Sequence, residues 1–151
     1  MKNNMSTFKS YKEFNGYSTA FRQWRAESHC KYIHGYALKF KVWFEGELDD
    51  RNWVVDFGCF KRNGVKDWMK DQFDHTTVVA KDDPMMHRFE MLARDRMIQL
   101  RVMDDVGCEK FAEFVFNYLN KKIIEETAGR VKVQKVQCWE HNENMAEYYG
   151  K

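Results

Sequence analysis

The chain has 151 residues, of which 44% are hydrophobic and 16% are aromatic. This length suits one compact domain, so we expect a single domain over residues 1–151. The formal net charge is +2, from 25 basic and 23 acidic residues. That balance does not indicate a protein that binds nucleic acid, because such proteins usually carry a much larger basic excess.

Membrane and secretory signals are not evident in the sequence. We find no apolar run as long as a membrane span, and the polar stretch Met1–Ser10 lacks the apolar core of a signal peptide. The four cysteines are not arranged in a C-x-x-C motif, which makes a zinc ribbon or a redox motif a poor explanation. We therefore expect a cytoplasmic protein with free thiols, in which Cys59, Cys108 and Cys138 are small buried hydrophobic residues.

We predict mainly strands in the first third of the chain. Aromatic and β-branched residues indicate a strand over residues 7–21 that is bulged near Asn15-Gly16, followed by a loop over residues 22–33. Residues 36–45 form the clearest strand, because alternate residues are apolar. A turn-rich connection leads to residues 53–56, which we expect to pair with that strand as a hairpin.

Helices and shorter strands follow in the remainder. Apolar residues at helical spacing predict a helix over residues 57–72, which contains Gly64. An extended run covers residues 76–80. Asp83-Pro84 suits the start of a second helix, which ends near residue 95. We predict a short strand over 97–103, a long helix over 107–126 that stops before Gly129, and a strand over 131–140. This order indicates an α+β domain with antiparallel strands and helices on one face.

Two short motifs carry reactive side chains. Cys30 and His34 lie on a locally basic stretch, where a thiol of lowered pKa can act as a base or nucleophile or bind a metal. Asp74 precedes His75, and a carboxylate can orient an imidazole and raise its basicity. Neighbouring residues of a strand point to opposite faces, however, and the alternative is that Asp74 ends the helix while His75 lies on the surface.

Glu140 is the third candidate. It ends the last predicted strand, where its two oxygens can accept parallel hydrogen bonds from a guanidine-like edge such as that of a pterin. A solvated glutamate at a strand end is an equally good explanation of this residue taken alone.

Several of these stretches, in chain order, resemble motifs of the 6-pyruvoyltetrahydropterin and 6-carboxytetrahydropterin synthase family. Residues 17–21 resemble its Phe-Ser-Ala-Ala-His element, and residues 30–36 resemble its Cys-x-x-x-His-Gly-His element. Further similar stretches are residues 46–49 with 54–58, the Leu-Asp-His-like residues 73–75, the helix start at 108–110 and the strand 136–140. The resemblance covers most of the chain.

The resemblance implies a tunnelling fold, or T-fold. In this fold an antiparallel four-stranded sheet carries two helices on one face, and sheets of several subunits join into a barrel. It therefore implies a homo-oligomer, a trimer or a hexamer, and Trp43 on the otherwise polar strand face suits an interface. The implied activity is that of a lyase acting on dihydroneopterin triphosphate or a related pterin.

The resemblance also assigns roles to the candidate residues. Cys30 would be the base that removes a proton, with Asp74 and His75 as a proton relay. Glu140 would anchor the pterin, helped by Glu109. From their charge alone, we infer that Arg22, Arg25 or Lys31 holds the triphosphate.

The sequence departs from the family pattern at the zinc ligands. The family uses three histidines, whereas Phe21 and Tyr36 stand at two of these positions and only His34 remains as a metal ligand. Three alternatives follow: a zinc site rebuilt from His29, His34 and Cys30, a metal-free reaction with Tyr36 as the acid, or a protein that only binds a pterin or purine. A purely structural oligomer is a fourth. The sequence does not choose among queuosine, biopterin and folate synthesis.

Overall fold

The computed structural model describes residues 6–151; the first five residues of the polar N-terminal stretch lie outside this range. The described chain forms one sheet with helices against it. The strands are β1 (Phe8–Phe21), β2 (His34–Gly46), β3 (Thr76–Ala80), β4 (Leu100–Met103), β5 (Val131–His141) and β6 (Asn144–Tyr148). The helices are η1 (His29–Lys31, 3-10), α1 (Cys59–Arg62), α2 (Val65–Phe73), α3 (Met86–Arg94) and α4 (Cys108–Glu126).

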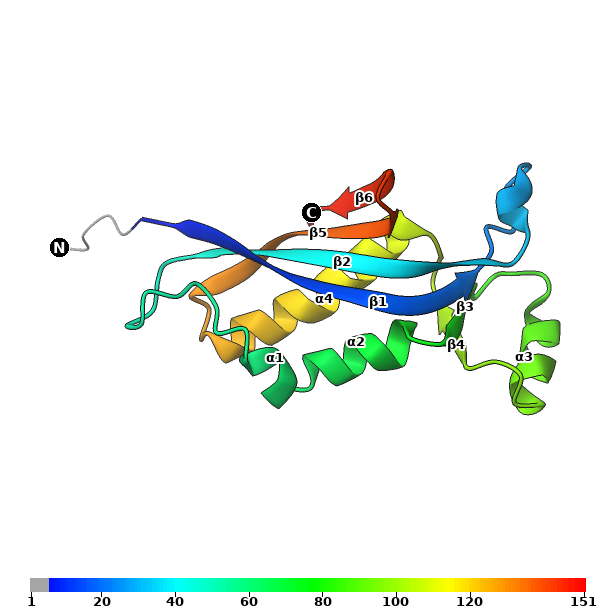
Figure 1. Ribbon diagram of the computed structural model, residues 1–151, viewed down its shortest axis with the longest axis horizontal. Helices are drawn as coiled ribbons and strands as arrows, with labels where there is room; N and C mark the ends of the chain where they lie inside the picture. Colours follow the sequence, from blue (N-terminus) through cyan, green and yellow to red (C-terminus); the bar gives the residue numbers. More distant parts are fainter. Residues whose placement is uncertain (1–5) are drawn as a thin grey trace.

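The sheet has the strand order β4-β3-β1-β2-β5-β6 (Figure 1). Four neighbouring strands, β1, β2, β5 and β6, pair antiparallel, as the T-fold predicts. Strands β3 and β4 extend this sheet by parallel pairing, which the sequence did not predict. A register shift between Phe14 and Tyr17 confirms the predicted bulge at Asn15-Gly16.

Helices α2 and α4 cover one face of the sheet (Figure 1). The alternation in β2 places Leu38, Phe40, Val42 and Phe44 on that face, where all four are fully buried. Between the two helices, the ring of Trp68 stacks on that of Tyr118 with centroids 3.7 Å apart. Burial of this apolar surface provides the main driving force for the fold. The α+β class predicted from the sequence is therefore confirmed.

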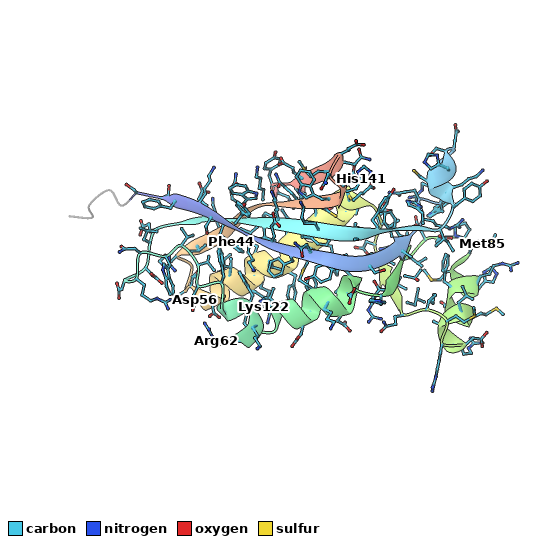
Figure 2. The ribbon with its side chains drawn as sticks, viewed as in Figure 1. Phe44, Asp56, Arg62, Met85, Lys122 and His141 are labelled. Carbon is cyan, nitrogen blue, oxygen red and sulfur yellow. The ribbon has the colours of Figure 1, made fainter. Side chains whose placement is uncertain are left out.

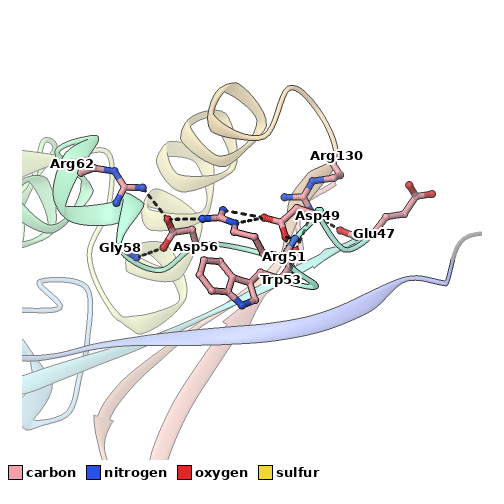
Figure 3. Close-up of polar contacts among 8 residues, drawn as sticks. All are labelled: Glu47, Asp49, Arg51, Trp53, Asp56, Gly58, Arg62 and Arg130. Atoms are coloured by element: carbon pink, nitrogen blue, oxygen red, sulfur yellow. Dashed lines mark hydrogen bonds and ion pairs between the residues drawn. The ribbon is translucent and has the colours of Figure 1, made fainter.

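The expected hairpin at residues 53–56 is wrong, because this segment forms a loop held by side chains (Figure 3). The Asp49 carboxylate accepts hydrogen bonds from the backbone amides of Arg51 and Trp53, at 2.9 and 3.0 Å. Asp56 in turn accepts from the Gly58 amide and from the Arg62 guanidinium, both at 3.0 Å. Such local side-chain bonds give the backbone an alternative to strand pairing.

Three further differences concern the helices and the chain end. The predicted helix 57–72 is divided into α1 and α2, because Gly64 adopts a left-handed conformation with φ of 82°. Helix α3 begins at Met86, after a turn in which the Asp83 carboxylate accepts from the Met85 amide at 2.8 Å, rather than at Pro84. Strand β6 was not predicted. In the described residues no helix is long and apolar enough to span a membrane.

Candidate functional site

Tyr36 lies at the centre of a group of candidate residues at one end of the sheet. Glu140, Cys30 and Cys108 lie close enough for their charges to act on its hydroxyl. Its ring also faces the ring of His141, with centroids 6.1 Å apart. Burial, followed by the nearby charge of Glu140, raises the pKa of Tyr36 above its ordinary value, so the hydroxyl stays protonated and remains a hydrogen-bond donor.

Cys30 belongs to the short helix η1 and is half-buried. Its backbone amide donates to the Ser28 hydroxyl at 3.3 Å, and its carbonyl accepts from the Gln23 amide at 2.9 Å. These bonds fix the backbone that carries the thiol. The structure thus brings Cys30 and Glu140, which are far apart in sequence, close to the same tyrosine.

Two arginines of the loop before η1 are bound to an acidic corner formed by Asp82 and Asp83. The Arg22 guanidinium donates to both oxygens of Asp83, at 2.8 and 2.6 Å, and this carboxylate is only 1% exposed. Arg25 pairs with Asp82 and lies 4.0 Å from Asp105. Burial raises the pKa of Asp83, but hydrogen bonds from Arg22 and the Met85 amide outweigh it, and the net shift is downward.

This pairing bears on the predicted substrate contact of Arg25. Its guanidinium is 58% exposed but is already shared between two carboxylates, and it also lies 4.3 Å from the Trp24 ring centroid. A phosphate group would have to replace Asp82 as its partner. The role of Arg25 in binding substrate stays a prediction.

Beside Tyr36, two free thiols face each other in the core. The sulfur atoms of Cys108, at the start of α4, and Cys138, on β5, are 3.5 Å apart. Burial, followed by the hydrogen bond to Cys108, raises the pKa of Cys138 well above its ordinary value, and the charges of Glu140 and Glu109 add to this shift. Both predicted pterin-binding glutamates therefore lie around the same buried thiol. The expected burial of Cys59, Cys108 and Cys138 is confirmed.

Asp74 and His75 form the second group, at the start of β3. The Asp74 carboxylate accepts from the Ser18 amide at 3.1 Å and lies 3.1 Å from His75 Nδ1. The direct contact arises because His75 has a left-handed backbone with φ of 56°, so the two residues do not follow strand alternation. The hydrogen bond from Ser18 outweighs burial and, together with His75, lowers the pKa of Asp74.

The two groups are not joined within one chain. Among the described residues no hydrogen bond or ion pair links Cys30 to Asp74 or His75. The imidazole of His75 is 77% exposed and lines a hollow of about 440 Å³ with residues such as Ala20, Ala37 and Gln99. Ala37 alternates with Tyr36 and Leu38 along β2, so this hollow lies on the face that α2 and α4 leave open. The Asp74–His75 pair therefore borders this open-face hollow, whose lining also includes Tyr36.

The residues at the zinc positions do not fit a zinc ion. Phe21 offers no ligand atom, and Tyr36 offers a phenol, which is not among the usual zinc ligands. His34 Nδ1 lies 2.7 Å from the Tyr32 carbonyl oxygen, which leaves this residue one free nitrogen. A catalytic zinc site needs three protein ligands. Over residues 6–151 the His, Cys, Asp and Glu side chains form no group of three that could hold a metal, so a site rebuilt from His29, His34 and Cys30 is not formed in this structure.

Comparison with known proteins identifies the family. The model of the 6-pyruvoyl tetrahydropterin synthase family matches residues 10–151. The chain belongs to this family. A relative from Pyrococcus horikoshii, named as a candidate 6-carboxy-5,6,7,8-tetrahydropterin synthase, is 28% identical over 141 residues, which are 90% of this chain and 85% of the relative.

Solved structures confirm the T-fold of this 6-pyruvoyl tetrahydropterin synthase family member. An uncharacterized protein from Wolinella succinogenes superimposes with a TM-score of 0.80 at 20% identity, covering 97% of this chain and 99% of that one. The 6-pyruvoyl tetrahydropterin synthase of Caenorhabditis elegans gives a TM-score of 0.66 at 19% identity, covering 97% and 98%. At these levels of sequence identity, the structural similarity shows a shared fold and no more.

The acidic corner is the part of the site that the sequence did not reveal. Of its two residues, we considered only Asp83 from the sequence, and only as the start of a helix. A signal was present: two adjacent acidic residues precede the single proline, while two arginines three positions apart precede Cys30. Only the parallel pairing of β3 with the end of β1 shows that these segments meet.

Proposed function

We propose that this chain is a tetrahydropterin synthase-type lyase that acts on the side chain of dihydroneopterin triphosphate or a related pterin. Cys30 is the base, Asp74 and His75 relay the proton, and Glu140 anchors the pterin, with Glu109 beside it. The observation that carries the proposal is the grouping of Cys30 and Glu140 near Tyr36, whose hydroxyl is affected by the charges of both. This grouping supports a site that contains the proposed base and the proposed carboxylate anchor together.

The chemistry follows from these groups. The Glu140 carboxylate accepts two parallel N–H bonds from the amino-pyrimidinone edge of a pterin, which orients the ring. The Cys30 thiolate then takes a proton from a side-chain carbon, and the bonding electron pair stays on the substrate, delocalised into the conjugated ring. Asp74 holds His75 by the 3.1 Å contact, so that the imidazole is oriented to carry the proton away.

The assay is incubation with dihydroneopterin triphosphate, followed by chromatography of the pterins and detection of released acetaldehyde and triphosphate. We expect Cys30→Ala to abolish turnover while pterin affinity is retained, because the thiol reacts and does not anchor. Glu140→Gln should weaken pterin binding about 10-fold or more, since one charged partner of the ring is lost. Cys59→Ala, at a buried cysteine on the far helix α1, is the matched control. Turnover that survives in Cys30→Ala contradicts the assignment.

We further propose that the active site is completed between copies of the chain in a homo-oligomer in the cytoplasm. The support is that Cys30 and the Asp74–His75 pair lie apart in one chain, while β1 has an open edge. Strand β3 pairs only with Thr19, Ala20 and Phe21, which leaves the earlier part of that edge without a strand partner in the described residues. Open edges are templates for pairing with another chain.

Mixed oligomers test the shared site. Cys30→Ala and His75→Ala should each be inactive alone. After joint refolding of equal amounts, about a quarter of wild-type activity should return, because that share of sites combines an intact Cys30 with an intact His75 from another copy. Mixtures that stay inactive, although the two variants are shown to co-assemble, would mean that base and relay belong to the same chain.

A further inference from the structure

Three aromatic rings fill the place where the family positions its zinc ligands. The ring centroids of Phe21 and His34 are 5.0 Å apart, those of Phe21 and Tyr36 are 6.0 Å apart, and those of His34 and Tyr36 are 5.4 Å apart. Phe21 is 1% exposed and packs edge-on against Phe111 of α4 at 5.1 Å. The three rings therefore pack beside one another here, with Phe21 in the core, Tyr36 packed against the core and His34 partly exposed.

The cluster offers few ligand atoms to a metal ion. A carbonyl oxygen only accepts, so the 2.7 Å contact with the Tyr32 carbonyl means that His34 Nδ1 carries a hydrogen and donates it, which leaves Nε2 as the one free imidazole nitrogen. Phe21 has no ligand atom, and the Tyr36 hydroxyl lies near the charges of Glu140 and Cys30. The cluster therefore presents one imidazole nitrogen and one phenol, rather than three lone pairs directed at a cation.

We propose that this chain works without a divalent metal, and that the Tyr36 hydroxyl binds the substrate side-chain oxygen next to the carbon that loses its proton. The inference rests on the proposed function, and among the alternatives that the sequence left open it selects the metal-free one. It assigns Tyr36 as a catalytic residue, because its hydroxyl touches the substrate.

The position of Tyr36 suits this role. Its hydroxyl lies near enough to Glu140 and Cys30 to be affected by the charges of both, so a donor is present where the pterin is proposed to dock. Packing against Phe21 and His34 fixes the ring, and a fixed donor needs no reorganisation during the reaction. In the reaction step the proton moves from carbon to the Cys30 sulfur, the electron pair stays on the substrate, and Tyr36 keeps its own proton while its hydrogen bond steadies the oxygen.

Zinc content tests the metal part and needs no turnover. The wild-type protein is purified, equilibrated with excess zinc, dialysed and measured by elemental analysis together with the variant Phe21→His/Tyr36→His. We expect less than about 0.1 zinc per chain in the wild type and about one in the variant, which presents three imidazoles. Circular dichroism establishes that the variant is folded. If replacement of the buried Phe21 unfolds it, Tyr36→His alone should still raise zinc affinity, since two imidazoles then lie side by side.

One stoichiometric zinc in the wild type would overturn the proposal. So would a folded histidine variant that gains no zinc, because the three positions would then not surround a common point. Both results are independent of whether dihydroneopterin triphosphate is the substrate, so a failure of the proposed function is distinguishable from a failure of this inference.

Kinetics test the part assigned to Tyr36. Tyr36→Phe keeps the ring and removes the hydroxyl, and we expect kcat to fall about 100-fold, with a change in KM of less than about 3-fold, because one preorganised donor is lost. Tyr32→Phe, at a nearby tyrosine that is 64% exposed, is the control and should be unchanged. Wild-type activity should be insensitive to EDTA. Unchanged kcat in Tyr36→Phe, or activity that EDTA abolishes and zinc restores, contradicts the assignment.

Discussion

At the scale of single residues, the backbone of His75 decides how Asp74 acts. Its left-handed conformation turns the imidazole back toward the preceding carboxylate, and its amide donates to the Ser18 carbonyl at 2.7 Å. Asp74 meanwhile accepts from the Ser18 amide, so the pair is held against β1 by two backbone bonds. Sequence alternation predicted that these side chains would point apart, since it contains no information on a residue with positive φ.

Asp74→Asn should lower the free energy of unfolding at neutral pH by about 1 kcal/mol, because a charge-assisted hydrogen bond becomes a neutral one. The folded-state pKa of Asp74 lies below its ordinary value of 3.8. Its stabilising effect is therefore fully present above that value and is lost as the pH falls through the folded-state pKa. Urea denaturation from about pH 7 down to about pH 3 measures this. The difference from wild type should shrink at acid pH; a constant difference contradicts the prediction. Asp50→Asn, at an exposed aspartate, is the control.

At the scale of elements, residues 76–106 hold the loop that carries Cys30. The chain leaves β3, turns at Asp82-Asp83, forms α3 and returns as β4. Figure 1 shows α3 at the same end of the molecule as η1, and Figure 2 places Met85, the N-cap of α3, at that end as well. The buried Asp83 binds Arg22 on one side and the Met85 amide on the other, so one carboxylate joins both segments. We infer that Asp83 positions the Cys30 loop.

Asp83→Asn should cost about 2 kcal/mol of stability, because the partly buried Arg22 loses its ionic partner. It should also speed amide exchange in residues 22–33, which contain Cys30. Asp82→Asn, at an exposed pair, is the matched control and should cost less than about 1 kcal/mol. Hydrogen exchange followed by mass spectrometry checks both variants. Equal exchange of the 22–33 loop in Asp83→Asn and wild type would show that other contacts hold the loop.

At the scale of the whole molecule, the sheet keeps one open face and a long open edge. The open face carries aromatic rings covered by lysines: Lys39 lies 4.7 Å from the Trp139 ring centroid, and Lys135 lies 5.2 Å from that of Trp43. Both indole N–H groups are buried without a hydrogen-bond partner in the described structure. Such groups are costly in a finished fold. A second copy of the chain packed against this sheet would bring hydrogen-bond acceptors near these indole groups.

Hydrogen exchange at two protein concentrations tests the proposed assembly. Backbone amides along the open edge of β1, within residues 8–17, should be protected in concentrated solution and lose that protection on dilution. Strand β2 is the internal control, because it pairs with β1 and β5 within the same chain and should not respond. Light scattering gives the mass of the particle. A mass of one chain at all concentrations, with unchanged β1 exchange, would exclude assembly through this edge.

The features that the sequence could predict are those set by interactions between residues close together in the chain. Alternation in β2 and the apolar stripe of α4 are local patterns that reflect burial, and both elements appear where we expected them. The loop at 53–56 and the start of α3 depend on carboxylates that bind backbone amides, so apolar patterning could not show them. Strand β6 has only five residues, none of which is fully buried, so it gives little apolar signal.

The candidate site was predictable residue by residue but not as an arrangement. Cys30 and Glu140 were singled out separately, and only the folded sheet brings both to Tyr36. The placement of Cys30 on η1, apart from His75 next to β3, likewise depends on how the chain folds. No spacing in the sequence encodes that relation.

The separation of the proposed base from its proposed relay has a consequence for how the protein must be handled. A site built from two copies has no active monomer, so specific activity per chain would fall with dilution even while every chain stays folded. Inactivity at the nanomolar concentrations of a routine assay would then report dissociation and not the absence of catalysis. Enzyme concentration must therefore be varied in the assay, as substrate concentration is.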